Sequence, residues 1–142
     1  MKRTIKSLTS IVFAFALIFT VVSCGTTESV GVWENATYVN DTALGEGEKT
    51  VVVEVKAEEQ TVTFTVKTDA DTVGAALLEN DLIAGEDGQY GLYVKSVNGI
   101  VADYDIDQTY WAFYIDGEYS MTGVDTTEIT EGVTYQLERV KG

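Results

Sequence analysis

Alternation of apolar and mostly polar side chains over residues 50–68, with a break at residues 57–60, constrains the fold of this chain more than any other feature. The apolar positions are Val51, Val53, Val55, Val62, Phe64 and Val66, and the residues between them are mostly Glu, Lys and Thr. Successive side chains of a strand point to opposite faces of a sheet. The break at residues 57–60 therefore predicts a β-hairpin with one apolar face, which a second layer of structure has to cover.

A helix is expected directly after this hairpin. Residues 69–72, Asp-Ala-Asp-Thr, supply N-cap side chains, and Val73, Ala76 and Leu77 recur at helical spacing. We therefore predict a helix over about Thr72 to Asn80, with its apolar stripe on the sheet. Gly74 either weakens this helix or permits close packing against it.

Turn residues divide the rest of the chain into further strands. Asn98-Gly99 and Asp116-Gly117 are strong hairpin patterns, and residues 85–88 and 131–132 are expected turns. The strands that they bound are Tyr90 to Val97, Thr109 to Ile115, a return over Glu118 to Thr122, and Thr134 to Val140. A hairpin, a helix and three or four strands predict the α+β class. We expect residues 50–142 to form a β-grasp-like mixed sheet with one helix packed on one face.

The first 23 residues have the composition of an export signal. Lys2, Arg3 and Lys6 precede a largely apolar stretch of 15 residues, numbers 8–22, and Ser23 stands before Cys24. This order describes a signal peptide over residues 1–23, and the stretch is shorter than the roughly 20 residues of a transmembrane helix. Residues 21–24, Val-Val-Ser-Cys, are similar to a bacterial lipobox, which implies cleavage before Cys24 and lipidation of that cysteine. The alternative is an ordinary secretory signal with a cysteine at the cut by chance.

Residues 24–49 are expected to form the lipidated N-terminus and a flexible tether. They mix Gly, Thr, Ser, Asn and Glu without sustained periodicity. Trp33, Tyr38 and Val39 are exceptions, and the alternative is that they form an extra edge strand on the domain. The expected localisation is a cell surface or the periplasm, with the chain attached to a membrane through lipid.

The residue inventory excludes most catalytic and metal sites. The chain has no histidine and one cysteine, which rules out Ser-His-Asp and Cys-His catalysis and the usual zinc sites. Residues 103–107 resemble the start of a calcium loop, but Gln108 stands where such a loop needs glycine, and Tyr114 stands where it needs the bidentate acid. No pair of carboxylates is singled out for hydrolysis. We therefore expect no enzyme activity, no metal site and no resident cofactor.

Charge is divided between the leader and the domain. All 23 acidic residues follow Cys24, whereas three of the nine basic residues precede it, so the mature chain has six basic residues and a formal net charge of −17. Such a surface repels nucleic acid and anionic lipid head groups. It favours the solubility of an exported domain, and the alternative is attraction of a cationic partner.

Two motifs at a characteristic spacing resemble a known bacterial family. They are Tyr90-Gly91-Leu92-Tyr93-Val94-Lys95-Ser96-Val97-Asn98-Gly99 and Tyr110-Trp111-Ala112-Phe113-Tyr114-Ile115-Asp116-Gly117-Glu118. With the preceding helix and the late Glu131-Gly132 turn, they resemble the bacterial domain of unknown function that is similar to the C-terminal domain of transcobalamin. Asp116 replaces the family's usual Asn, and Val133 stands where the late turn usually carries an acid. The resemblance covers about Thr50 to Gly142 and implies a β-grasp-like fold.

The resemblance also implies a kind of ligand. The C-terminal domain of transcobalamin and intrinsic factor helps to clasp cobalamin, and in those carriers a second, larger helical domain supplies half of the site. A corrinoid or a similar small nutrient is therefore the ligand that the family suggests. Similarity of fold alone does not establish function.

The strand from Tyr110 to Ile115 separates its side chains onto two faces. Trp111, Phe113 and Ile115 share one face, which we expect to be core against the helix. Tyrosines on the other face suit binding, because each has a rigid apolar body and one polar tip. The candidate ligand-binding residues are Tyr90, Tyr104, Tyr110, Tyr114, Tyr119 and Met121. The alternative is that these side chains only shield the sheet.

Two functions are compatible with these features. The first is a membrane-anchored extracytoplasmic binding lipoprotein that captures a small nutrient and passes it to a membrane transporter. The second is a protein-protein interaction module that docks another envelope protein through the same face or an open strand edge. A concave aromatic pocket favours the first, and a flat aromatic patch beside a free edge favours the second.

Overall fold

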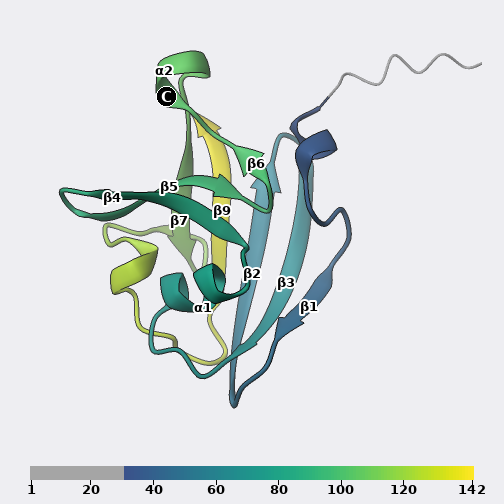
Figure 1. Ribbon diagram of the computed structural model, residues 1–142, viewed down its shortest axis with the longest axis vertical. Helices are drawn as coiled ribbons and strands as arrows, with labels where there is room; N and C mark the ends of the chain where they lie inside the picture. Colours follow the sequence, from purple (N-terminus) through teal and green to yellow (C-terminus); the bar gives the residue numbers. More distant parts are fainter. Residues whose placement is uncertain (1–30) are drawn as a thin grey trace, which may run out of the picture.

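Two β-sheets and one short α-helix build the part of the chain that the computed structural model describes, residues 31–142 (Figure 1). In chain order the elements are the 3-10 turn η1 (Val32–Asn35), β1 (Thr42–Gly45), β2 (Lys49–Ala57), β3 (Gln60–Thr68), α1 (Val73–Glu79), β4 (Ile83–Gly88), β5 (Gly91–Val97), β6 (Ile100–Val101), the single-turn helix α2 (Tyr104–Asp107), β7 (Thr109–Ile115), β8 (Glu118–Tyr119), the 3-10 turn η2 (Val124–Thr126) and β9 (Thr134–Lys141). Among the described residues α1 is the one helix longer than a turn. This composition confirms the predicted α+β class.

The larger sheet has six strands in the order β1-β3-β2-β9-β7-β8. The predicted hairpin forms its β2–β3 pair, with Val53 opposite Phe64. The central pair β2 and β9 is parallel, with Val53 opposite Tyr135, and β7 runs antiparallel to β9. The alternation of side chains places the apolar residues of β2, β3 and β9 on one face, where they form the core.

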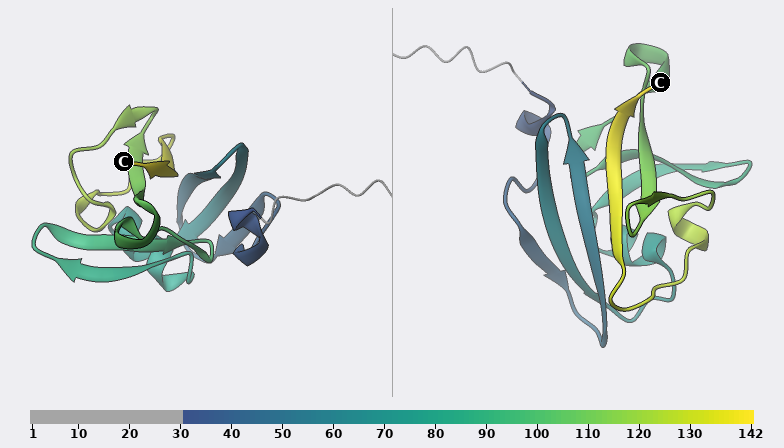
Figure 2. Two further views of the ribbon diagram at one scale, coloured as in Figure 1. Left: turned by 90° about the horizontal axis from the view of Figure 1, so that it is seen from above. Right: turned by 180° about the vertical axis from the view of Figure 1, so that it is seen from behind.

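A second layer covers this apolar face. It consists of the three-stranded sheet β4-β5-β6, the helix α1 and the turn η2. Figure 1 shows β4 and β5 running across β7 and β9, and Figure 2 shows the same two layers from above and from behind. The helix begins where predicted, because the Thr72 hydroxyl accepts a hydrogen bond from the Ala75 amide at 3.2 Å. Its buried face, Val73, Ala76 and Leu77, packs toward β3 and β4.

Residues 31–49 differ from the expected tether, because they pack on the domain. Trp33 lies in η1, and its indole nitrogen donates to the Ala57 carbonyl at 2.9 Å. The ring of Tyr38 meets that of Phe64 edge-on at 5.8 Å. An edge strand does form, but it is β1, parallel to β3, rather than the segment around Trp33 and Tyr38. These contacts are long-range, so the local sequence does not encode them.

The segment Gly85–Gly88 is part of strand β4 and not the predicted turn, which lies instead at residues 89–90. Its first glycine has another role. The pairing with β5 shifts register between Ala84 and Gly85, and a Cβ atom on Gly85 would lie 2.1 Å from the Tyr93 carbonyl oxygen. Glycine is therefore required here for close approach of two strands rather than for a turn.

The predicted signal peptide and Cys24 lie outside the described residues. Within residues 31–142, no helix has the length and apolar character needed to cross a membrane.

Candidate functional site

A pocket of about 320 Å³ lies between the two layers, where β5 passes β7. We call it the aromatic pocket. It is lined by Tyr90, Leu92, Tyr93, Val94, Trp111, Phe113, Tyr119, Ser120, Met121, Thr122, Gly123, Val124 and Leu137. These residues come from β5 and the turn before it, from β7 and β9, and from the stretch that runs from the end of β8 to the start of η2.

The floor of the aromatic pocket is apolar and buried. Trp111 and Phe113 are each 8% exposed, and Leu137 is buried. The antiparallel register sets Phe113 opposite Leu137, and the Phe113 ring stacks on that of Tyr135 with centroids 6.0 Å apart. The prediction that Trp111 and Phe113 are buried is therefore confirmed, whereas Ile115, expected on the same buried face, is only partly buried. The layer above them is β5 rather than the expected helix.

The rim carries side chains that are open to solvent. Tyr90 is 90% exposed and Met121 is 92% exposed, although both are large and apolar. Tyr90 lies in the turn between β4 and β5, and Met121 lies in the segment after β8. That segment is held in place by the Ser120 amide, which donates to the Phe113 carbonyl at 2.9 Å. Exposed apolar side chains around a hollow are typical of a binding site.

Two polar side-chain atoms of the described residues are buried without a hydrogen-bond partner. They are Nε1 of Trp111 and Oδ1 of Asp125, and they are the buried side-chain atoms of residues 31–142 found in this state. The other carboxylate oxygen of Asp125 accepts a hydrogen bond from the Leu92 amide at 3.1 Å. An unpaired buried donor or acceptor costs about 1–3 kcal/mol and calls for an explanation.

Two glycines leave room for the Asp125 carboxylate. A Cβ atom on Gly91 would lie 2.7 Å from its Oδ2, and a Cβ atom on Gly123 would lie 2.7 Å from its Oδ1. Gly91 also has a φ of 107°, which L side chains rarely adopt. Side chains at either position would therefore displace the carboxylate.

An ion pair supports the hairpin that carries Tyr90. Lys95 on β5 lies 3.2 Å from the Glu86 carboxylate on β4. The hydrogen bond and the charge of Glu86 raise the pKa of Lys95 above its ordinary value. Both groups are well exposed to solvent, so the pair contributes little to stability.

The structure brings three of the six candidate residues together. Tyr90, Tyr119 and Met121 line the aromatic pocket. Tyr110 and Tyr114 belong to the opposite face of β7, and the Tyr114 ring meets that of Tyr119 edge-on at 5.7 Å. Tyr119 therefore lies at the rim of the aromatic pocket and also contacts Tyr114 on the opposite face of β7.

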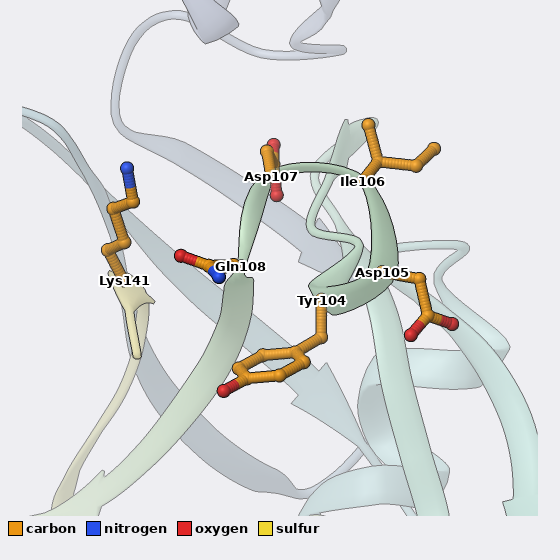
Figure 3. A pocket seen from close by; sticks show the side chains of 6 residues that line it. All are labelled: Tyr104, Asp105, Ile106, Asp107, Gln108 and Lys141. Carbon is orange, nitrogen blue, oxygen red and sulfur yellow. The ribbon is translucent and has the colours of Figure 1, made fainter.

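Tyr104 lies at a second hollow, of about 430 Å³, near the start of β7. This hollow is lined by Tyr104, Asp105, Ile106, Asp107, Gln108 and Lys141 (Figure 3). Asp107 accepts hydrogen bonds from the amide and hydroxyl of Thr109 and pairs with Arg139 at 2.6 Å. The Thr109 hydroxyl above all, with help from Arg139, holds the pKa of Asp107 below its ordinary value. The Asp107 carboxylate is therefore already paired with other groups of the domain.

Nothing in residues 31–142 groups three or more His, Cys, Asp or Glu side chains for a metal ion. The segment 103–107, which resembles the start of a calcium loop, instead forms α2. Asp103 caps this turn by accepting a hydrogen bond from the Asp105 amide at 3.0 Å.

Sequence reasoning missed one feature of the aromatic pocket and one contact beside it. Trp111 and Phe113 were expected only as core, and their position under β5 makes them lining residues as well. Asp125 carried no pattern that would single it out, because its place depends on the approach of η2 to β5.

Comparison with known proteins places this geometry in a family. Residues 70–135 match the Domain of unknown function (DUF4430). The crystal structure of "a putative metal binding protein from Ruminococcus gnavus ATCC 29149" is 32% identical in sequence with a TM-score of 0.63, over 67% of this chain and 99% of that one. No curated protein matches the chain.

A more distant likeness concerns the fold alone. Haptocorrin, in its crystal structure in complex with Cbi, is 20% identical with a TM-score of 0.51, over 66% of this chain and 25% of that one. The predicted resemblance to a transcobalamin-like fold is confirmed at this level. The chain belongs to the family of the Ruminococcus gnavus protein, and its residues 70–135 match DUF4430.

Proposed function

We propose that this chain is a membrane-anchored extracytoplasmic lipoprotein whose aromatic pocket binds a small molecule. The observation that carries the proposal is a concave site with a buried Trp111 and Phe113 floor and an exposed aromatic rim. Its volume of about 320 Å³ falls at the lower end of the range of roughly 300–1,000 Å³ that is usual for ligand pockets.

A corrinoid or a similar nutrient is the proposed ligand. The strand order β3-β2-β9-β7 with a parallel central pair supports a β-grasp-like domain, and haptocorrin, which has a similar fold, was solved with Cbi bound. A macrocycle is larger than the aromatic pocket, so one edge would enter it. The rest would lie against Tyr90 and Met121, whose side chains are free to make contact.

Tryptophan fluorescence tests this proposal. The chain has two tryptophans, and Trp33 is held on Ala57, in a different hollow from the aromatic pocket. A Trp33→Phe variant therefore reports on Trp111 alone. We expect saturable quenching when cyanocobalamin or dicyanocobinamide is added, after correction for corrin absorption. A flat titration, together with no retention in equilibrium dialysis, would reject the corrinoid.

The membrane anchor is proposed from Cys24, the one cysteine of the chain. Two or more acyl chains anchor stably, whereas one holds only marginally. The intact mass of the protein extracted from membranes should correspond to a chain that starts at Cys24 with added lipid. A Cys24→Ala variant should appear in the soluble fraction. An unmodified mass would reject the anchor and leave the pocket proposal standing.

A protein-protein interaction module is the second candidate function, and one observation favours it. Tyr119 is 57% exposed on β8, a strand that pairs on one side only. A partner such as a membrane transporter could add a strand at this edge. Photo-crosslinking groups placed at Tyr119 and, as a control, at Val39 would test it in intact membranes. Discrete adducts from Tyr119 alone would support docking at β8.

A further inference from the structure

We infer that Thr127 is a positioning residue for the aromatic pocket, because its hydroxyl holds residues 120–123 in the conformation in which they line that pocket. Thr127 directly follows η2, is partly buried and is not itself a lining residue. This inference rests on the proposed function, since it concerns the same site. It adds a residue that fixes the shape of the pocket rim from behind.

Residues 120–123 form one side of the rim, and all four line the aromatic pocket. They lie between β8 and η2, outside the regular strands and helices, so no strand pairing sets the conformation of the whole segment. Met121 in its middle is 92% exposed, which means that packing does not hold this side chain in place. The shape of the segment therefore depends on the hydrogen bonds at its two ends.

The two ends of the segment are tied to different elements of the fold. At the first end, the Ser120 amide donates to the Phe113 carbonyl on β7 at 2.9 Å. At the other end, the Thr127 hydroxyl donates to the Gly123 carbonyl at 2.8 Å. Thr127 is itself held by α1, because its carbonyl accepts a hydrogen bond from the amide of the fully buried Val73 at 2.9 Å.

The hydroxyl groups of the segment form a chain that ends at Thr127. A hydroxyl has one proton to donate, and Thr127 donates its proton to Gly123. The Thr122 hydroxyl, 3.2 Å from that of Thr127, is therefore the donor in this pair. The Ser120 hydroxyl donates in turn to Thr122, whose carbonyl and hydroxyl oxygens both lie 3.0 Å away, and it accepts from the Thr122 amide at 3.2 Å. Loss of the Thr127 hydroxyl removes the last acceptor of this chain.

Thr126 offers a matched comparison on the same turn. Its hydroxyl also donates to the Gly123 carbonyl, at 3.2 Å, but Thr126 is exposed, and the Thr122 hydroxyl bonds to Thr127 instead. If both threonines only supported η2, their substitution would have similar effects. A role in positioning the rim predicts that substitution at Thr127 alone disturbs residues 120–123.

Three variants test the inference: Thr127→Val, Thr127→Ser and Thr126→Val. Valine keeps the shape of threonine without the hydroxyl, whereas serine keeps the hydroxyl. Each variant would be made in the chain from Gly25 to Gly142, which contains every described residue and the whole described core. The first readout needs no ligand and is the ¹⁵N order parameter of the Met121 amide. We expect about 0.85 in the unsubstituted chain, in Thr127→Ser and in Thr126→Val, and a fall below about 0.6 in Thr127→Val.

The second readout is the affinity for dicyanocobinamide, measured by quenching of Trp111 in the Trp33→Phe background. Thr127→Val should weaken binding about threefold to tenfold, the fold-change that corresponds to roughly one net hydrogen bond. Thr127→Ser and Thr126→Val should stay within about twofold of the unsubstituted chain. If Thr127→Val does not fold, Thr122→Val removes the other hydroxyl of the same hydrogen bond at an exposed position and gives the same reading of the Met121 amide.

Failure of this inference and failure of the proposed ligand are distinguishable. A Met121 amide that stays ordered in folded Thr127→Val would overturn the inference, and so would a disordered rim with unchanged affinity for dicyanocobinamide. If the unsubstituted chain does not bind dicyanocobinamide, the corrinoid proposal fails. The order parameter of Met121 then decides alone whether Thr127 positions the rim.

Discussion

The side-chain amide of Asn98 forms two hydrogen bonds with the backbone of Tyr38, 60 residues earlier in the chain. Its Nδ2 donates to the Tyr38 carbonyl at 2.7 Å, and its Oδ1 accepts from the Tyr38 amide at 2.9 Å. The backbone carbonyl of Asn98 also accepts from the Thr37 amide at 2.8 Å. Asn98 is fully buried, with a φ of 52°. Asn98 therefore pairs with the backbone of the N-terminal segment much as a neighbouring strand would, and it attaches that segment to the domain.

Replacement of Asn98 by alanine is expected to lower the free energy of unfolding by about 2–4 kcal/mol, because two backbone groups of Tyr38 lose their partners. Asn98→Gly is the matched variant, since it loses the same hydrogen bonds but tolerates positive φ, so it should be less harmful by about 1 kcal/mol. Urea unfolding measures both, and hydrogen exchange at the Tyr38 amide should accelerate. Slow exchange at Tyr38 in Asn98→Gly would show that other contacts hold the segment.

Gly74 lies in α1 where the helix meets η2. A Cβ atom there would lie 2.8 Å from both the Cα and the backbone nitrogen of Asp125. Gly74→Ala should therefore destabilise the domain by about 1–3 kcal/mol, although alanine is the better helix former by about 1 kcal/mol. Thermal and urea unfolding measure whether Gly74→Ala lowers or raises the free energy of unfolding.

Ala75→Gly serves as the control for helix propensity, because Ala75 is exposed on the same helix. It should cost about 1 kcal/mol and leave the aromatic pocket unchanged. Gly74→Ala, in contrast, should shift the amide resonances of Asp125 and Leu92. A stabilised Gly74→Ala variant would mean that η2 moves away from α1 at little cost.

Asp107 gives the stability a defined pH dependence. Its pKa is lowered in the folded chain, first by the Thr109 hydroxyl and further by Arg139. A group with a depressed pKa contributes stability above its unfolded pKa of about 3.9, and this contribution is lost as the pH falls through the folded value. Unfolding curves between about pH 5 and pH 2 should therefore show a loss of stability that is smaller in Asp107→Asn.

Asp105→Asn is the matched control for this pH dependence. Asp105 lies on the same turn, but its side chain points away from Lys141 (Figure 3). The Asp105→Asn variant should lose as much stability at acid pH as the unsubstituted chain does. A carboxyl titration by NMR that places Asp107 at or above about 3.9 would contradict the role of Thr109.

Local periodicity explains which elements could be predicted. The alternation of Val51, Val53 and Phe64 set the hairpin, and the helical spacing after Thr72 set α1, because each pattern reports directly on one buried face. Strand β4 was missed because Gly85 and Gly88 usually mark turns. Here Gly85 serves the close approach of the Tyr93 backbone, which is a property of the pairing and not of the segment.

The aromatic pocket could be predicted only in part. Tyrosines are expected to mark a ligand site, and Tyr90 and Tyr119 line the aromatic pocket. The pocket itself arises where β5 packs against β7 and meets η2. Packing between distant segments leaves no periodic pattern in the local sequence. The sequence therefore shows which side chains are available for a pocket, but it does not show how they are arranged.

Substitutions on the two faces of β7 are expected to have different effects on the affinity for the ligand. Trp111 and Phe113 face the aromatic pocket, whereas Tyr110 and Tyr114 face the other way. Tyr110→Ala combined with Tyr114→Ala should therefore leave the affinity for the corrinoid within about twofold. Tyr90→Ala combined with Met121→Ala should weaken it about tenfold, because each loses roughly 0.5–1.5 kcal/mol of contact. Both double variants would be measured by quenching of Trp111 in the Trp33→Phe background. Loss of binding in the Tyr110 and Tyr114 pair alone would place the ligand on the outer face of the larger sheet.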